Sequence, residues 1–272
     1  ATVQGSHGKS ASLANRFQVG DCGNLGFSPK LKLDFGKSKK NTKRNAHPPL
    51  RAKLAFNEGD ANISSVQVAL PEGVLLDQER IGKVCSREAY AASSCPAESQ
   101  VGYAKATTPL LDNPVEGPVY LKASDNVLPD LAADLNGQID IDLFGRIDQR
   151  EGKRVSRIQN TFDVVPDVPV ADFELTLAGG NDGLLVNSKS ICASKRSQKV
   201  SIDMSAHNEM TLSENPLIGS ACKSINKKKA KKLRKKANKL LAKAKKASSK
   251  QKAKKLRKQA RKLKRQARKL GR

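Results

Sequence analysis

The side chains with the clearest binding chemistry lie in the last fifty residues of the chain, 223–272. This segment holds 26 of the 51 Lys and Arg residues and no Asp or Glu, whereas the preceding 222 residues carry 25 basic and 26 acidic groups. Nearly all of the net charge of +25 therefore belongs to the tail. Cations at this density attract the phosphate, sulfate or carboxylate groups of a polyanion, because binding releases condensed counterions.

The tail contains an internal duplication. The sequence KKAKKLRKKANKL at 228–240 returns 23 residues later as QKAKKLRKQARKL at 251–263. Ala and Leu recur at spacings of three and four in both copies, which predicts helices with a narrow apolar stripe surrounded by cations. Ala247, Ser248 and Ser249 separate the copies and shift the register by two positions, so one continuous heptad seam is excluded. Repulsion between cations four residues apart predicts fraying in dilute buffer and folding on binding, so the sequence leaves a helical or a disordered free tail open.

We predict that cations of the two copies and of the residues after them make the polyanion contacts. They are Lys231, Lys232, Arg234, Lys235, Lys236, Lys254, Lys255, Arg257, Lys258, Arg261, Lys262, Lys264, Arg265, Arg268 and Lys269. The expected partners are anionic cell-envelope polymers or acidic lipid head groups. Nucleic acid is the alternative, through phosphate contacts only, because the tail has no aromatic residue on which a base could stack. A third interpretation is a solvated tail that serves solubility.

Five cysteines agree with an oxidising compartment. Nine residues separate Cys85 from Cys95, which suits a small disulfide loop, and this is the preferred pair. For the others, Cys192 with Cys222 would fix the last strand before the tail, and Cys22 with Cys222 would join the ends of the body. Five reduced thiols in a cytoplasmic protein are the competing interpretation. A zinc site is disfavoured because the chain has no C-x-x-C motif.

No pattern of residues indicates catalysis, and we expect no enzyme activity, metal or cofactor. The chain lacks the G-x-S-x-G motif of serine hydrolases, and a Trp-free chain with three Tyr gives little support for a glycosidase cleft. Asp140, Asp142 and Asp148 could hold calcium, but Phe144 stands where an EF-type loop needs an oxygen ligand. No run of about 18 apolar residues exists, so no transmembrane segment is expected.

The chain before the tail is predicted to consist mainly of short strands. Apolar residues alternate with polar ones from Phe17 onward, and Gly, Pro and Asn turns separate the runs. The predicted strands include 17–19, 31–35, 50–56, 63–70, 119–121, 139–147, 158–164, 173–177, 184–186 and 200–204, and a short helix is predicted at 87–92. This pattern favours an all-β chain of one or two immunoglobulin-like antiparallel sandwich units. We expect a flexible lead-in at 1–15, a first unit at 16–113, a second at 114–222 and the basic tail at 223–272, with a single larger sandwich as the alternative.

An ordered series of short motifs over residues 17–222 resembles the modules of large secreted or surface proteins of actinobacteria. The motifs are Cys22-x-x-Leu25-x-Phe27-x-Pro29, Cys95-Pro96-x-x-Ser99-x-Val101-Gly102, Thr108-Pro109-Leu110-Leu111, Gly117-Pro118-Val119-Tyr120-Leu121, Leu128-Pro129-Asp130-Leu131, Phe162-x-x-Val165-Pro166-Asp167-Val168-Pro169 and Gly183-Leu184-Leu185-Val186-Asn187. The resemblance excludes the tail. It implies an extracytoplasmic β module and no catalytic residues. We therefore predict a non-enzymatic extracellular or cell-surface structural or adhesive protein whose tail attaches it to polyanions.

Overall fold

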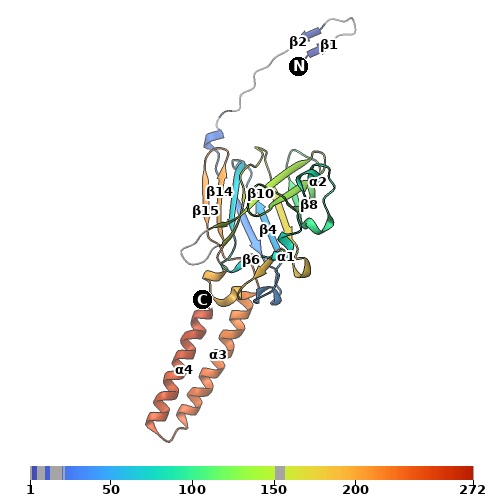
Figure 1. The fold of residues 1–272 in the computed structure, drawn as a ribbon. Coiled ribbons are helices and arrows are strands. Elements are labelled where there is room, and N and C mark those ends of the chain that lie inside the picture. The colour runs from blue at the N-terminus through green and yellow to red at the C-terminus, as the bar shows by residue number, and fades with distance from the viewer. Residues whose placement is uncertain (1, 5–9, 13–19, 21, 151–156, 272) are drawn as a thin grey trace.

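The computed structural model describes residues 2–4, 10–12, 20, 22–150 and 157–271. Most of the predicted lead-in at 1–15 and the strand predicted at Phe17 and Val19 lie outside these residues. Within the lead-in, strands β1 (Thr2–Gln4) and β2 (Ser10–Ser12) pair with one another. In Figure 1 this pair lies beyond one end of the β body, and two long helices project from the other end.

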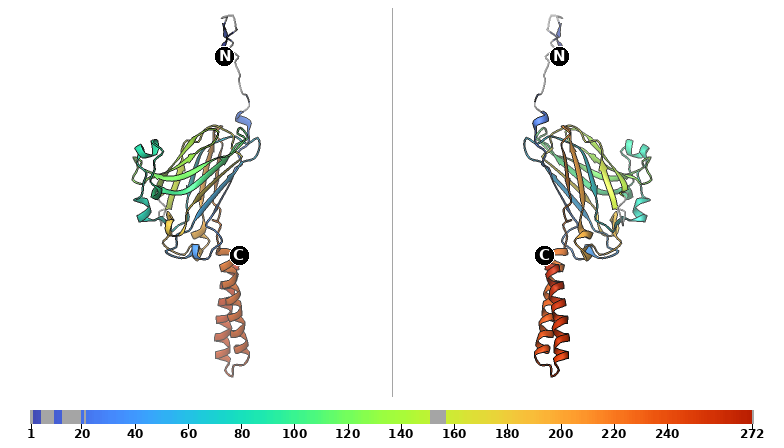
Figure 2. Two further views of the ribbon diagram at one scale, coloured as in Figure 1. Left: turned by 90° about the vertical axis from the view of Figure 1, so that its right-hand side faces the viewer. Right: turned by 90° about the vertical axis from the view of Figure 1, so that its left-hand side faces the viewer.

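The body is built on one antiparallel sheet of eleven strands. Their order is β15-β14-β5-β11-β10-β9-β8-β7-β12-β4-β3. The strands are β3 (Lys30–Asp34), β4 (Leu50–Ala55), β5 (Ile63–Ala69), β7 (Gln100–Thr107), β8 (Val115–Lys122), β9 (Asp130–Leu135), β10 (Ile141–Arg150), β11 (Arg157–Phe162), β12 (Asp172–Leu177), β14 (Ser201–Ala206) and β15 (Thr211–Glu214). A separate two-stranded sheet pairs β6 (Val74–Leu76) with β13 (Leu185–Asn187). The large sheet curls strongly into a half-barrel (Figure 2).

The expectation of one or two immunoglobulin-like sandwich units is wrong. Strands from both sides of residue 113 are neighbours in the one sheet, since β5 pairs with β11 and β4 pairs with β12. Alternating apolar residues indicate that one face of a strand is buried, but they do not say what buries it. In this fold the sheet curls over its own apolar face, which produces the same alternation as a sandwich.

The short helices lie in the connections between strands. They are α1 (Gln78–Ile81), α2 (Arg87–Ala91), η1 (Cys22–Asn24), η2 (Lys40–Thr42), η3 (Ala97–Ser99), η4 (Gly180–Asp182), η5 (Ile191–Ala193) and η6 (Arg196–Gln198). The helix predicted at 87–92 is confirmed as α2, and Ser86 caps it by accepting a hydrogen bond from the Ala89 amide. Cys85 and Cys95 form a disulfide around α2, and Cys85 exchanges backbone hydrogen bonds with the β8 region.

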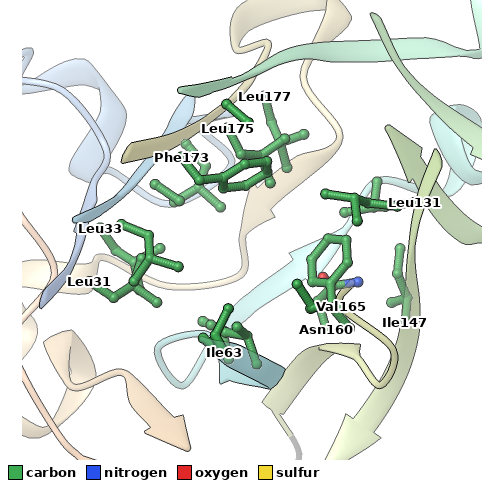
Figure 3. Close-up of a pocket in the computed structure, with 18 of the residues that line it drawn as sticks. Leu31, Leu33, Ile63, Leu131, Ile147, Asn160, Val165, Phe173, Leu175 and Leu177 are labelled. Carbon is green, nitrogen blue, oxygen red and sulfur yellow. The ribbon is translucent and has the colours of Figure 1, made fainter. Parts of the chain in front are cut away.

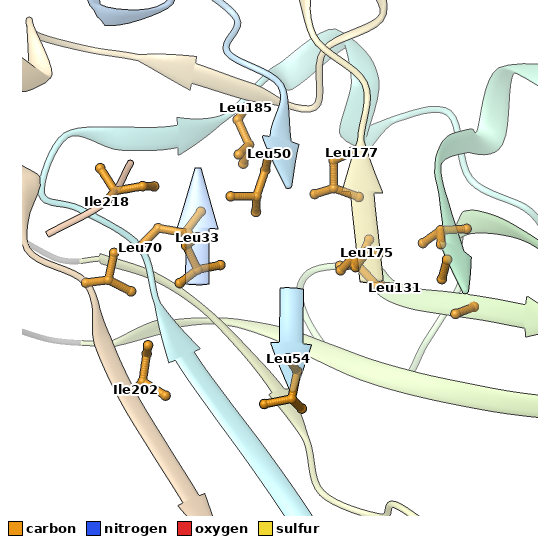
Figure 4. Close-up of a cluster of buried hydrophobic side chains, with 14 of the residues drawn as sticks. Leu33, Leu50, Leu54, Leu70, Leu131, Leu175, Leu177, Leu185, Ile202 and Ile218 are labelled. Carbon is orange, nitrogen blue, oxygen red and sulfur yellow. The ribbon is translucent and has the colours of Figure 1, made fainter. Parts of the chain in front are cut away.

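The concave side of the half-barrel contains both a packed core and a cavity. Side chains around the cavity, among them Leu31, Ile63 and Phe173, surround a space of about 160 Å³ (Figure 3). Beside it, Leu33, Leu54 and further Leu and Ile side chains pack together (Figure 4).

Residues 216–219 bridge the edge strand β3 and the start of β14, the strand next to the other edge, at the end that carries the long helices. The Phe35 amide donates to the Gly219 carbonyl (2.8 Å), and the Gly219 amide donates to the Leu33 carbonyl (2.7 Å). Directly before β14, the Val200 amide donates to the Pro216 carbonyl (2.9 Å). Residues 216–219 therefore connect β3 with the start of β14, directly before the tail begins.

Candidate polyanion-binding hairpin

The tail forms two helices that fold back on one another. Helix α3 (Cys222–Lys245) and helix α4 (Lys250–Gly271) run side by side and stand clear of the sheet (Figures 1 and 2). Residues 246–249 connect them, which is where the duplicated sequence changes register. The register shift is therefore the turn of a hairpin, and each copy of the repeat supplies one helix. The sequence left a helical and a disordered tail open, and the structure has the helical form.

Alanine fills the contact between the two helices. Ala230, Ala237 and Ala244 are buried on α3 at intervals of seven residues, and Ala260 and Ala267 are buried on α4 at the same interval. Small side chains at such positions allow two helix backbones to approach closely. The Leu residues of the stripe are only half-buried at the flanks of this contact. The apolar stripe of each helix therefore packs against the other helix, and the cations face outward.

All fifteen cations predicted to bind a polyanion are exposed. Nine further exposed cations of α3 and α4 were not predicted: Lys223, Lys227, Lys228, Lys229, Lys239, Lys243, Lys245, Lys250 and Lys252. The number of Lys and Arg residues in the tail was enough to predict that these nine are exposed. A helix with a single narrow apolar stripe must present all of its cations to solvent. The structure exposes these residues, and their role in binding stays a prediction.

The hairpin carries an unusually high linear charge density. Its 24 cations, twelve on each helix, are distributed over the length of the hairpin, which is about 36 Å for the 24 residues of α3 at 1.5 Å per residue. This is about one positive charge per 1.5 Å of hairpin, close to the one negative charge per about 1.7 Å of double-stranded DNA. Among the described residues, every ion pair lies in the body between His47 and Asp203, so the tail cations have no protein carboxylate to neutralise them.

Repulsion within the hairpin favours an external anion. Each helix contains seven cation pairs at i and i+4. At about 0.2 to 0.5 kcal/mol each, these fourteen pairs destabilise the helices by about 3 to 7 kcal/mol in low salt. A bound polyanion removes this repulsion, so binding and helix stability are linked.

A disulfide fixes the base of the hairpin to the body. Cys222, the first residue of α3, is bonded to Cys192 in η5, which confirms one of the two pairings considered for Cys222 and excludes Cys22 as its partner. The body end of α3 is therefore held covalently. Arg196, four residues after Cys192, donates a hydrogen bond to the half-buried Glu72 carboxylate (3.0 Å), which also lies 3.7 Å from Arg157.

Removing this anchor tests its contribution. We expect the Cys192→Ser/Cys222→Ser double variant to lose about 3.6 kcal/mol of unfolding free energy, because the bridge closes a loop of 30 residues. Hydrogen exchange should speed up in the first turns of α3. The Cys85→Ser/Cys95→Ser variant is the control, since it should lower stability while leaving exchange at α3 unchanged. Equal exchange at α3 in both variants would contradict an anchoring role.

The other predicted chemical groups are dispersed. Asp142 accepts a hydrogen bond from the Tyr90 hydroxyl, and Asp148 pairs with Arg146 (3.2 Å). Burial, together with the Asp142 carboxylate, raises the pKa of Tyr90. In the described part of the chain, no three His, Cys, Asp or Glu side chains are grouped so that they could hold a metal ion. Nor is any helix there long and apolar enough to cross a membrane.

Comparison with known proteins gives no family for this chain. No protein-family model and no curated protein sequence matches it. One solved structure, that of the Iho670 flagellar-like filament, is 12% identical over an alignment that covers 77% of this chain and 87% of that chain, with a TM-score of 0.21. A likeness at this level establishes neither a shared fold nor a shared function.

Proposed function

We propose that the protein is a non-enzymatic extracellular or cell-surface β protein that the hairpin attaches to anionic cell-envelope polymers or acidic lipid head groups. The observation that carries this proposal is the hairpin itself, with 24 exposed cations and no acidic residue. Its surface can follow a flexible chain of phosphate or carboxylate groups without requiring a shaped pocket. The resemblance to actinobacterial surface modules agrees with this proposal and stays a prediction.

The two disulfides support a location outside the cytoplasm. Cys85–Cys95 and Cys192–Cys222 are both formed, and disulfides persist mainly in oxidising compartments. Intact-mass analysis of protein taken from its host without reductant should therefore find two disulfides. Five free thiols would count against an extracellular location and in favour of the second candidate.

The second candidate is nonspecific binding to nucleic acid through phosphate. The charge spacing of the hairpin favours it, because that spacing matches the spacing of charge on a duplex. The absence of aromatic residues from α3 and α4 limits any such contact to the backbone, without sequence preference. DNA binding in low salt does not distinguish the candidates, because any polycation shows it. Location and thiol state distinguish them.

Deleting residues 223–272 tests the proposal directly. We expect the truncated protein, which keeps Cys222 and the whole sheet, to lose retention on cell-wall material and on vesicles with acidic head groups at 100 mM salt. Its melting temperature and disulfide content provide the control that the body remains folded. Retention equal to that of the full chain would reject attachment by the hairpin.

A further inference from the structure

The cavity inside the half-barrel has a lining that is almost wholly apolar. Side chains from eight strands of the sheet and from the two-stranded sheet border the space of about 160 Å³, and among the described residues that line it Asn160 alone has a polar side chain. Asn160 already uses its amide group to donate a hydrogen bond to the Arg146 carbonyl (3.2 Å). None of the lining residues within the described part of the chain carries a charge. An ion placed here would have no counter-charge, so the chemistry of the space suits hydrocarbon.

The shape of the sheet explains why the core side chains do not fill this space. The chain has no Trp, and the aromatic residues in the lining, as far as the chain is described, are Phe56, Phe162 and Phe173. Leu, Val and Ile side chains from facing parts of the curled sheet are too short to meet across it (Figure 3). An engineered cavity of about 150 Å³ with a similar lining stays dry and takes up benzene-sized apolar molecules. A cavity with this lining can accept an apolar group.

A short segment, residues 163–171, lies over one side of the cavity. We call it the strap. It connects β11 to β12, which are separated by four strands in the sheet. Val165 and Val168 of the strap line the cavity and are half-buried, as are Phe56 and Phe173 beside them. The cavity is therefore bordered here by side chains that solvent reaches.

The strap is held mainly near its two ends. The Val165 amide donates to the Ser64 carbonyl (3.0 Å), and the Ala171 amide donates to the Thr107 carbonyl (2.8 Å). Between them, the Asn62 side chain donates to Asp167 (2.9 Å). The part from Val168 to Val170 has one further backbone bond, from the Val168 amide to the Pro166 carbonyl (2.9 Å), which stays within the strap. A chain-like ligand can pass this stretch with little loss of protein hydrogen bonding.

We propose that the half-barrel binds the end of a single hydrocarbon chain, with the chain end inside the cavity and the rest passing out beside the strap. The head group of the ligand remains in solvent. Arg146 precedes Ile147, the residue of β10 that pairs with Asn160. It already forms ion pairs with Asp148 and Asp163, so it is not available to bind a carboxylate head group of the ligand. The shared chemistry of the ligand is thus an unbranched alkyl or acyl end, free or part of a lipid.

Fluorescence of N-phenyl-1-naphthylamine with the full-length protein tests this proposal. The experiment is done in 0.5 M NaCl, where screening weakens any contribution of the hairpin. We expect saturable binding of one probe per chain at micromolar concentration, and complete displacement by 1-decanol. Decanoate and phospholipid vesicles are separate arms that distinguish a free chain from a membrane source. Displacement by decanoate but not by 1-decanol would overturn the neutral-chain proposal, and so would the absence of saturable binding.

A cavity-filling substitution separates ligand binding from folding. Ala106 lines the cavity and is buried, so Ala106→Leu should fill part of the space, keep or raise the melting temperature and weaken probe binding at least tenfold. Ala171→Leu is the matched control, because Ala171, the last residue of the strap, is exposed and does not line the cavity. It should leave binding unchanged. Equal binding by the wild type and a folded Ala106→Leu variant would reject the cavity as the site.

Discussion

Raising NaCl from 50 to 200 mM should weaken binding of the full chain to double-stranded DNA, used here as a polyanion of known charge spacing, by at least about 10³-fold. The reason is counterion release. A protein that contacts six to ten phosphates loses about 10³ to 10⁵ in affinity over this range. The 24 exposed cations of α3 and α4 can supply at least that number of contacts. The measurement is the slope of log K against log salt.

Neutralising part of the hairpin should reduce this slope by about 0.9 for each phosphate contact removed. The variant replaces eight α4 cations with Gln, which keeps helix propensity high. The replaced residues are Arg257, Lys258, Arg261, Lys262, Lys264, Arg265, Arg268 and Lys269. Gln259→Ala/Gln266→Ala is the matched control, because both residues are exposed on α4 and the charge is unchanged. An unchanged slope in the eightfold variant would place the polyanion elsewhere on the protein.

Gly117→Ala should lower the unfolding free energy of the body by at least about 3 kcal/mol, the upper part of the range for overpacking. Gly117 lies in β8, and a Cβ atom placed there would sit 1.8 Å from the Asp134 carbonyl oxygen of the neighbouring strand. Neither group is a flexible side chain end, so the two strands must separate. For a domain of about 200 residues, the melting temperature should fall by about 6 to 12 °C.

Gly23→Ala is the control for this substitution. Gly23 is exposed in η1, and no atom lies within 4 Å of the Cβ position. Its melting temperature should match that of the wild type. Gly102→Ala in β7 should resemble Gly117→Ala, because its Cβ would lie 2.2 Å from the Thr176 carbonyl oxygen. A fall of less than 2 °C in both variants would show that close strand approach at these glycines does not support the curl.

The sequence predicted most strands well because its period-two patterns are local. Leu50 to Ala55, Ile63 to Ala69 and Phe173 to Leu177 are strands, as expected. Strand pairing was not predictable in the same way. It depends on contacts between residues more than a hundred positions apart, such as Leu54 with Phe173, and no local pattern encodes them. The two-unit sandwich failed for this reason.

The two candidate sites also differed in how far they could be predicted from local sequence. The cations of the hairpin are consecutive in sequence, so composition and the 23-residue repeat were enough to find most of them. The cavity could not be found this way. Leu31, Leu131 and Leu175 look like ordinary core residues in the sequence, and only the curvature of the sheet leaves a space between them. The two disulfides were partly predictable from the sequence. The spacing of the cysteines favoured Cys85–Cys95 but left the partner of Cys222 open.

The strand order also has a consequence for the sequence of folding events. The hairpin pairs segments joined by four residues, and such helical contacts form on the microsecond scale. The half-barrel closes only when residues 216–219 reach β3, after about 180 intervening residues have been arranged. Sheets with such distant pairings fold in milliseconds to seconds. The basic hairpin therefore matures well before the half-barrel that contains the cavity, and the Cys192–Cys222 bond joins the early-folding part of the chain to the late-folding one.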